Sequence, residues 1–179
     1  MIDPIFLKIG GIEIRYYGIL FALAFLLGYF IANKLCKEFK ISRDIVEDLV
    51  IYILVAAVAG ARLFHVLFYN FGYFMSNPIK IFYVWEGGLS SHGAIIAIIS
   101  VVYFYCKKHK LRFYDIADLF IIPIALGAAF VRLGNFINGE LVGKITALPW
   151  GVYFANYEGL RHPVQLYQFS YYIIIFFRF

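Results

Sequence analysis

Charged side chains are scarce in this sequence. Asp, Glu, Lys and Arg together account for 15% of its 179 residues, whereas soluble domains average about 25%. Hydrophobic residues make up 63% of the chain, and the mean hydropathy is +0.81. A soluble fold of this length has too little interior to bury so much apolar surface. The composition therefore excludes an ordinary soluble domain and indicates a membrane protein.

Cysteine is also rare, and no signal-peptide pattern is present. Cys36 and Cys106 are too few for a disulfide framework. The first apolar run is too long for a signal-peptide core, and no small-residue cleavage site follows it. We expect this run to remain in the protein as a membrane span. Because no repeat or low-complexity linker divides the chain, one domain is expected over residues 1–179.

Long apolar runs predict five membrane-crossing helices, since such a helix needs about 20 mostly apolar residues. The runs are Tyr17–Leu35, Leu49–Phe68, Leu89–Tyr105, Ile116–Ile137 and Val164–Phe177. Small residues around Gly60 in the second run would let another helix approach closely. We therefore expect an all-α fold, a polytopic transmembrane helix bundle.

The basic residues indicate how these spans are oriented. The net charge of +5 comes from Lys and Arg in short connections between apolar runs, which argues against a nucleic-acid partner. The first connection has Lys34, Lys37, Lys40 and Arg43, and the third has Lys107, Lys108, Lys110 and Arg112. By the positive-inside rule both face the cytoplasm. The N-terminus and residues 69–89 and 138–162 are then expected outside.

Polar side chains within the spans gather at one depth. Arg132 follows Ile116 by 16 residues, which puts it about 24 Å up a hydrocarbon core about 30 Å thick. Arg62 reaches a similar outer depth in the second span, and Tyr17 and His92 begin spans on the outer side. Because ionisable residues in spans are costly, this convergence predicts a site near the outer leaflet.

Each of these residues also has a structural interpretation. Arg62 fits an arginine that extends to the phosphate layer equally well. Tyr17 fits an aromatic-belt anchor, and a lone His92 is more often structural, although glycines surround it. Arg132 is the strongest candidate, because Asn135 shares its helix face and Asn138 and Glu140 follow.

Two classes of function fit these residues. One is a lipid-handling enzyme that uses arginine against phosphate, and the other is a small membrane transporter. A transporter path needs polar residues toward both faces and often a repeated half. The polar residues lie on one side only, which favours the enzyme. No cluster suitable for a metal or nucleotide is present, so no cofactor is expected.

Six motifs then indicate a family. They are RYYG near the N-terminus, GARLFHVLFYN (Gly60–Asn70), VWEGGLSSHG (Val84–Gly93), VRLGNFINGELVG (Val131–Gly143), LPWGVYF (Leu148–Phe154) and RHPVQLY (Arg161–Tyr167). In sequence and order they resemble the bacterial prolipoprotein diacylglyceryl transferase family. The resemblance implies seven spans with the N-terminus outside, in the bacterial cytoplasmic (inner) membrane.

The resemblance also implies a reaction. The family moves the diacylglyceryl group of phosphatidylglycerol onto the thiol of the lipobox cysteine in a prolipoprotein signal peptide. A thioether forms and glycerol phosphate is released, as the first step of bacterial lipoprotein maturation. The expected partners are therefore phosphatidylglycerol, the prolipoprotein and membrane lipid, with no metal.

Residue roles follow from the matched motifs. Arg132 matches the phospholipid-binding arginine, and we expect catalytic roles for Arg132, His92 and Tyr17. His92 could accept the thiol proton or only orient a partner. Substrate binding is expected from Arg132 and from five further residues of matched motifs: Asn135, Asn138, Glu140, Gly143 and Arg62.

The chain departs from the family pattern in a few places. Val131 and Ala94 replace usual glycines, and Gln168 replaces a usual glutamate. The fifth span stops near Phe179, whereas family members continue through further helices that include another essential arginine. The resemblance therefore implies a C-terminally truncated member, with an inactive fragment as an alternative.

Overall fold

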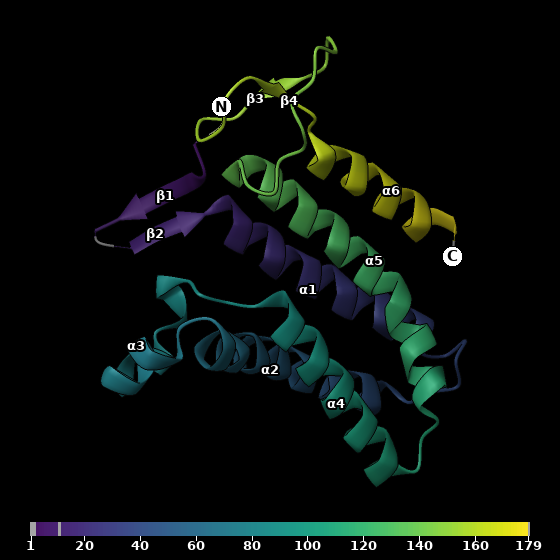
Figure 1. The fold of residues 1–179 in the computed structure, drawn as a ribbon. Coiled ribbons are helices and arrows are strands. Elements are labelled where there is room, and N and C mark those ends of the chain that lie inside the picture. The colour runs from purple at the N-terminus through teal and green to yellow at the C-terminus, as the bar shows by residue number, and fades with distance from the viewer. Residues whose placement is uncertain (1–2, 11, 179) are drawn as a thin grey trace. The chain divides into compact units, whose positions relative to one another are not determined.

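Helices account for most of the chain in the computed structural model, which describes residues 3–10 and 12–178 (Figure 1). The α-helices are α1 (Tyr16–Leu35), α2 (Arg43–Phe68), α3 (Phe71–Ser76), α4 (Ser91–His109), α5 (Phe113–Asn138) and α6 (Val164–Arg178). Two 3-10 helices, η1 (Pro78–Phe82) and η2 (Val84–Glu86), lie between α3 and α4. The predicted all-α membrane bundle is confirmed, and each predicted span is helical except that α4 begins at Ser91, two residues after the predicted start at Leu89.

Three of the described helices are long and apolar enough to cross a membrane: α1, α2 and α5. The other two predicted spans differ from these three in hydropathy or in length. Helix α4 ends in Lys107, Lys108 and His109, which lowers its mean hydropathy, and α6 has 15 residues. That α4 and α6 also cross the membrane stays a prediction. Phe179, near which the fifth predicted span stops, lies outside the described residues.

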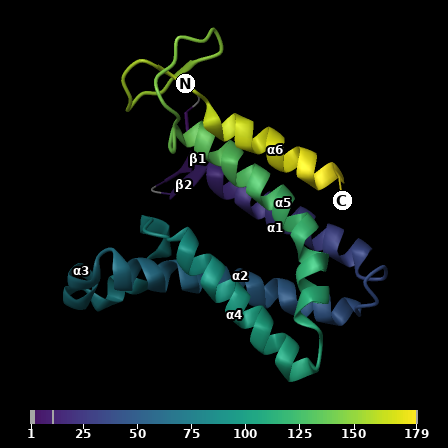
Figure 2. The same ribbon diagram turned by 45° about the vertical axis from the view of Figure 1, so that its right-hand side comes forward.

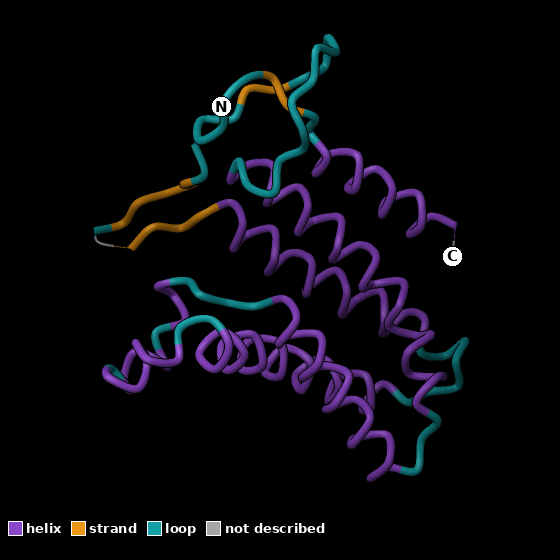
Figure 3. The backbone as a smooth tube through the Cα atoms, viewed as in Figure 1, coloured by secondary structure: helices purple, strands orange, loops and turns teal. Residues whose placement is uncertain are grey.

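Two short antiparallel hairpins were not predicted from the sequence (Figure 3). Strands β1 (Ile5–Ile9) and β2 (Ile12–Arg15) form the first, and β3 (Val152–Tyr153) and β4 (Leu160–Arg161) form the second. In the first hairpin Glu13 pairs with Lys8 at 2.8 Å and with Arg15 at 3.1 Å. Hydrogen bonds from Lys8 and then Arg15 lower the pKa of the Glu13 carboxyl.

The described residues group into two compact units, and the chain passes from one to the other after Lys34, at the end of α1, and after Leu119, within α5. The first unit contains residues 1–34 and 120–179. In it α1 and α5 lie side by side and antiparallel (Figures 1 and 2). A Cβ added at Gly28 would lie 3.4 Å from Pro123, and one at Gly134 would lie 2.7 Å from the ring of Tyr17. One domain over the whole chain stays a prediction.

Residues 35–119 form the second unit, in which α2 and α4 pack as an antiparallel pair. A Cβ at Gly60 would lie 2.6 Å from the carbonyl oxygen of Gly93 and would overlap Ala97. The close approach predicted from the small residues is therefore confirmed. At the other end of the pair, the Tyr105 hydroxyl donates to Asp48 at 3.1 Å. The basic connections before α2 and after α4 consequently lie at the same end of this unit.

Candidate active site

The end of α5 forms the centre of the first unit's polar cluster. Gly139 has φ +66°, a conformation that glycine adopts without steric cost. The Gly139 N–H donates to Phe136 O at 3.1 Å and the Glu140 N–H to Asn135 O at 3.0 Å. This pair of bonds closes the helix in a Schellman motif. The sequence Asn138-Gly139-Glu140 thus ends the helix and turns Glu140 back toward it.

Glu140 organises three amide side chains. Its Oε1 accepts hydrogen bonds from Asn135 Nδ2 at 2.9 Å and Asn138 Nδ2 at 3.2 Å. Its backbone oxygen accepts one from Gln165 Nε2 at 2.7 Å. Because carboxylate and carbonyl oxygens only accept, these contacts fix which way each amide points. The three amide oxygens are buried and have no hydrogen-bond partner among the described residues, so they remain free to accept.

Tyr17 and Arg132 lie beside this cluster. The Tyr17 ring contacts α5 at Gly134 and lies within electrostatic range of Arg132 and Glu140. Arg132 is half-buried. In the part of the chain that the structure describes, its guanidinium makes no hydrogen bond and no ion pair. An arginine of this kind keeps its donors available for an anionic ligand.

Gly143 lies where two backbone segments meet. Its N–H donates to His162 O at 3.1 Å, and its carbonyl accepts from Arg161 Nη1 at 3.2 Å. A Cβ at this position would lie 2.6 Å from His162 O. This close approach explains why a glycine is present at position 143. The two hydrogen bonds hold the segment before α6 close to the segment that follows α5. A substrate contact by Gly143 stays a prediction.

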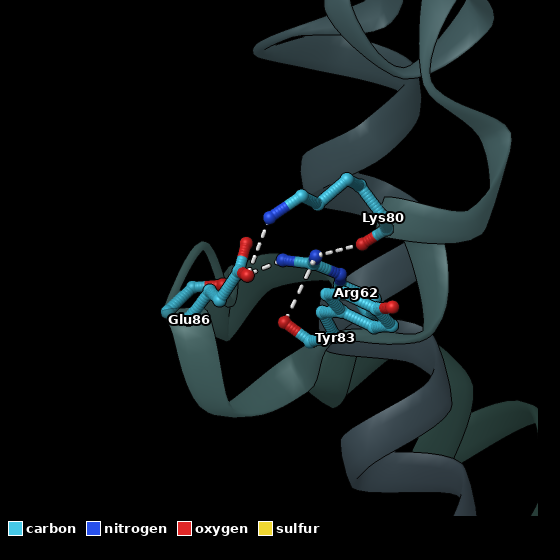
Figure 4. A network of polar contacts seen from close by, with 5 residues as sticks. Arg62, Lys80, Tyr83 and Glu86 are labelled. Carbon is cyan, nitrogen blue, oxygen red and sulfur yellow. Dashed lines mark hydrogen bonds and ion pairs between the residues drawn. The ribbon is translucent and has the colours of Figure 1, made fainter. Parts of the chain in front are cut away.

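Arg62 belongs to the second unit and is only 5% exposed. All three of its guanidinium nitrogens donate to backbone carbonyls, and Figure 4 shows the bonds to Lys80 and Tyr83. Nε donates to Ile81 O at 2.8 Å. Nη1 donates to Gly87 O at 2.5 Å and Gly88 O at 3.1 Å, and Nη2 donates to Lys80 O at 2.5 Å and Tyr83 O at 3.2 Å. These five bonds use the full donor capacity of a guanidinium, which leaves none for the substrate contact predicted from the sequence.

His92 lies in the first turn of α4 and is exposed. Its ring stacks on Phe64 of α2 with a centroid distance of 6.4 Å and an interplanar angle of 29°. Within residues 3–10 and 12–178 the imidazole has no hydrogen-bond partner. Both ring nitrogens are therefore available to exchange a proton or to contact a substrate.

The structure brings together five of the predicted site residues in the first unit: Tyr17, Arg132, Asn135, Asn138 and Glu140. Arg62 and His92 lie in the second unit, the first on α2 and the second on α4. Sequence reasoning missed Gln165, which is fully buried and bonded to Glu140. The available signal was a glutamine in the first turn of the mostly apolar helix α6. Across the described ranges no group of three His, Cys, Asp or Glu could hold a metal ion.

Comparison with known proteins identifies similar chains. The family model described as prolipoprotein diacylglyceryl transferase matches residues 4–179. Three relatives bear the name phosphatidylglycerol–prolipoprotein diacylglyceryl transferase. The Geobacter sulfurreducens protein is 39% identical over 93% of this chain and 65% of its own length. The Tolumonas auensis protein is 41% identical over 97% and 68%, and the Bordetella parapertussis protein is 42% identical over 93% and 66%. The chain thus spans about two thirds of the length of the curated relatives it matches.

Proposed function

Because this chain belongs to the prolipoprotein diacylglyceryl transferase family, we propose that its residues serve the transfer of a diacylglyceryl group from phosphatidylglycerol to a prolipoprotein. The acceptor is the thiol of the lipobox cysteine, and the product is a thioether. Two chains named for this reaction are 41% and 42% identical to this one over 97% and 93% of its length. The proposal makes this chain an enzyme of lipoprotein maturation.

The observation that carries the proposal is the half-buried, unpaired guanidinium of Arg132 beside a fixed set of polar groups. A phosphodiester is an anion, and arginine offers it two parallel donors. The Glu140 cluster holds three amide oxygens that can accept hydrogen bonds, and the headgroup of phosphatidylglycerol carries hydroxyls that donate them. Arg132 therefore suits the charge of this lipid, and the three amide oxygens suit its hydroxyls.

The proposed reaction forms one C–S bond and breaks one C–O bond. The acceptor thiol loses its proton, and the resulting thiolate attacks the diacylglyceryl carbon that bears the phosphate ester. The electron pair of the C–O bond leaves with the phosphate, which is released as glycerol phosphate. Arg132 stabilises the negative charge that grows on this leaving group. The match of His92 to the family motif is the ground on which we propose that it accepts the thiol proton, and its imidazole has no hydrogen-bond partner among the described residues.

The proposed location is the bacterial cytoplasmic membrane, with the site toward the outer leaflet. Three helices suit a membrane by length and composition. Within the second unit, the basic connections lie at one end of the α2–α4 pair and His92 lies at the other. The positive-inside rule supports a cytoplasmic position for the basic end.

The test is a transfer assay on a chimera, in which residues 1–179 of this chain replace the matching part of the Tolumonas auensis relative. The purified chimera is incubated with phosphatidylglycerol and a lipobox peptide, and the peptide is followed by mass spectrometry. We expect the peptide to gain the mass of one diacylglyceryl group, and a control peptide with serine in place of the cysteine to gain none. No gain, or an equal gain by the serine peptide, would contradict the proposed function.

A further inference from the structure

We propose that Arg62 is a positioning residue: it holds segment 80–88 (Lys80 to Gly88) in place and, through that segment, the first turn of α4 with His92. Its effect on catalysis rests on the proposed function, whereas its effect on segment 80–88 does not. Every step of the inference lies within residues 35–119, which form one compact unit.

The first step is that segment 80–88 and the side chain of Arg62 stabilise each other. The guanidinium is almost completely removed from solvent, and it makes no ion pair with a described carboxylate. Five backbone carbonyl oxygens accept its hydrogen bonds, and the centroid of the Phe74 ring lies 4.9 Å from Arg62 Cζ. These contacts replace the water that the guanidinium loses on burial. A buried charge is tolerated only when such groups surround it. In return the guanidinium donates to all five carbonyls, of which Lys80 O and Tyr83 O also accept from the backbone N–H groups of Tyr83 and Glu86.

The second step is that the chain conformation serves these contacts. Gly87 and Gly88 both have positive φ, at +87° and +75°, which other residues rarely adopt. Their carbonyls consequently both reach Nη1. A Cβ at Gly88 would lie 2.9 Å from that nitrogen and 2.7 Å from His65 Nε2. The two glycines thus let the backbone wrap closely around the guanidinium.

The third step connects this segment to His92. The Ser90 N–H donates to Ala61 O at 3.0 Å. The backbone therefore remains in contact with α2 at Ser90, directly after segment 80–88. Gly93 then packs against Gly60. Three successive residues of α2, Gly60 to Arg62, therefore hold the stretch on both sides of His92. Because the Gly60–Gly93 contact does not involve Arg62, loss of the guanidinium should free segment 80–88 while the helix pair stays packed.

Glu86→Gln provides a matched control in the same segment. Glu86 accepts a hydrogen bond from Lys80 Nζ at 2.5 Å, which raises the pKa of Lys80. Both side chains are partly exposed, and neither side chain contacts the guanidinium of Arg62. Removal of such a surface ion pair has little effect on folded structure.

The first experiment measures amide hydrogen exchange in the purified 179-residue chain, so it does not depend on any enzyme activity. In Arg62→Gln and Arg62→Lys, amides of segment 80–88 should exchange about tenfold faster or more, because their local structure opens more easily. Lysine is included because an ammonium has three donors and cannot reach five carbonyls. Amides of α2 and of α4 beyond its first turn, and all amides of Glu86→Gln, should exchange as in the parent.

Two exchange results would overturn the inference. Unchanged exchange of segment 80–88 in both Arg62 variants would mean that the guanidinium does not hold it. Faster exchange throughout α2 and α4 would make Arg62 a general stability residue rather than a positioning one.

The second experiment measures steady-state kinetics of Arg62→Gln in the chimera. A positioning role predicts a fall in kcat with the KM for phosphatidylglycerol unchanged within about twofold, because a lost transition-state arrangement acts on kcat. A raised KM with unchanged kcat would instead make Arg62 a substrate-binding residue. If the parent chimera has no transfer activity, the proposed function fails, and hydrogen exchange alone decides the claim about segment 80–88.

Discussion

Arg62 and Arg132 both lie in helices suited to a membrane, but their guanidinium groups have opposite surroundings. Arg62 is buried against five carbonyl oxygens of its own unit. Arg132 is half-buried and has no hydrogen-bond or ion-pair partner among residues 3–10 and 12–178. An unpaired arginine within a membrane-spanning helix is energetically costly unless an anionic group binds it. This contrast is why we propose an internal structural role for Arg62 and ligand binding for Arg132.

Replacement of Arg132 by lysine tests that assignment. In the chimera, Arg132→Lys should lower kcat/KM at least about tenfold, because a lost charge-assisted hydrogen bond is worth about 1.5–3 kcal/mol. The same exchange at Arg112, whose side chain is 82% exposed, is the matched control and should stay within about twofold of the parent. Near-normal turnover of phosphatidylglycerol by Arg132→Lys would show that charge alone suffices and that the forked donors are not needed.

At the scale of elements, α2 and α4 form the most closely packed helix pair of the second unit. Gly60 and Gly93 face each other, and neither has room for a Cβ. Without a hydrophobic force between helices in lipid, such small residues provide the close contact that stabilises a pair. The pair in turn supports both segment 80–88 and His92.

Two glycine-to-alanine changes separate packing from helix propensity. Gly60→Ala should lower the thermal stability in detergent, since forcing an extra methyl into a packed contact costs about 1–3 kcal/mol. Gly127→Ala, also within a helix but with nothing within 4 Å of its Cβ, should be neutral or stabilising by up to about 1 kcal/mol. Thermal unfolding followed by circular dichroism gives both values. An equal or higher melting temperature for Gly60→Ala would contradict the close packing.

The elements could be predicted from the sequence to the extent that hydropathy determines them. Apolar runs located all five long helices, and the small residues near Gly60 identified a close helix contact. The hairpins escaped prediction because their strands depend on cross-strand pairs such as Lys8 with Glu13. The roles of Arg62 and Gln165 escaped for a similar reason. Each bonds to backbone 18 or more residues away, and such partners are set by tertiary structure.

At the scale of the whole molecule, the distribution of charge predicts an orientation of the chain in a membrane. Lys37 precedes α2 and Lys108 ends α4, at the same end of the second unit. Asn77 lies at the opposite end of that unit, between α3 and η1. Glu158, in the first unit, lies between β3 and β4. The positive-inside rule then predicts that Lys37 and Lys108 face the cytoplasm, and that Asn77 and Glu158 face outward.

Cysteine labelling tests this orientation. Single cysteines are placed at these four positions in a background where Cys36 and Cys106 are replaced by alanine, and intact spheroplasts are treated with an impermeant thiol reagent. Cysteines at Asn77 and Glu158 should be labelled, whereas those at Lys37 and Lys108 should react only after the membrane is permeabilised. Labelling of either basic position in intact spheroplasts would reverse the proposed orientation.

The most direct test of the proposed transfer is to follow the bond that breaks. The chimera is given phosphatidylglycerol with ¹⁸O in the bridge between the diacylglyceryl carbon and phosphorus, together with the lipobox peptide. Attack by sulfur at carbon predicts that all of the label appears in released glycerol phosphate, in equimolar amount to peptide that carries diacylglyceryl. Label that stays with the lipid part, or a peptide that gains a single acyl chain, would contradict the account.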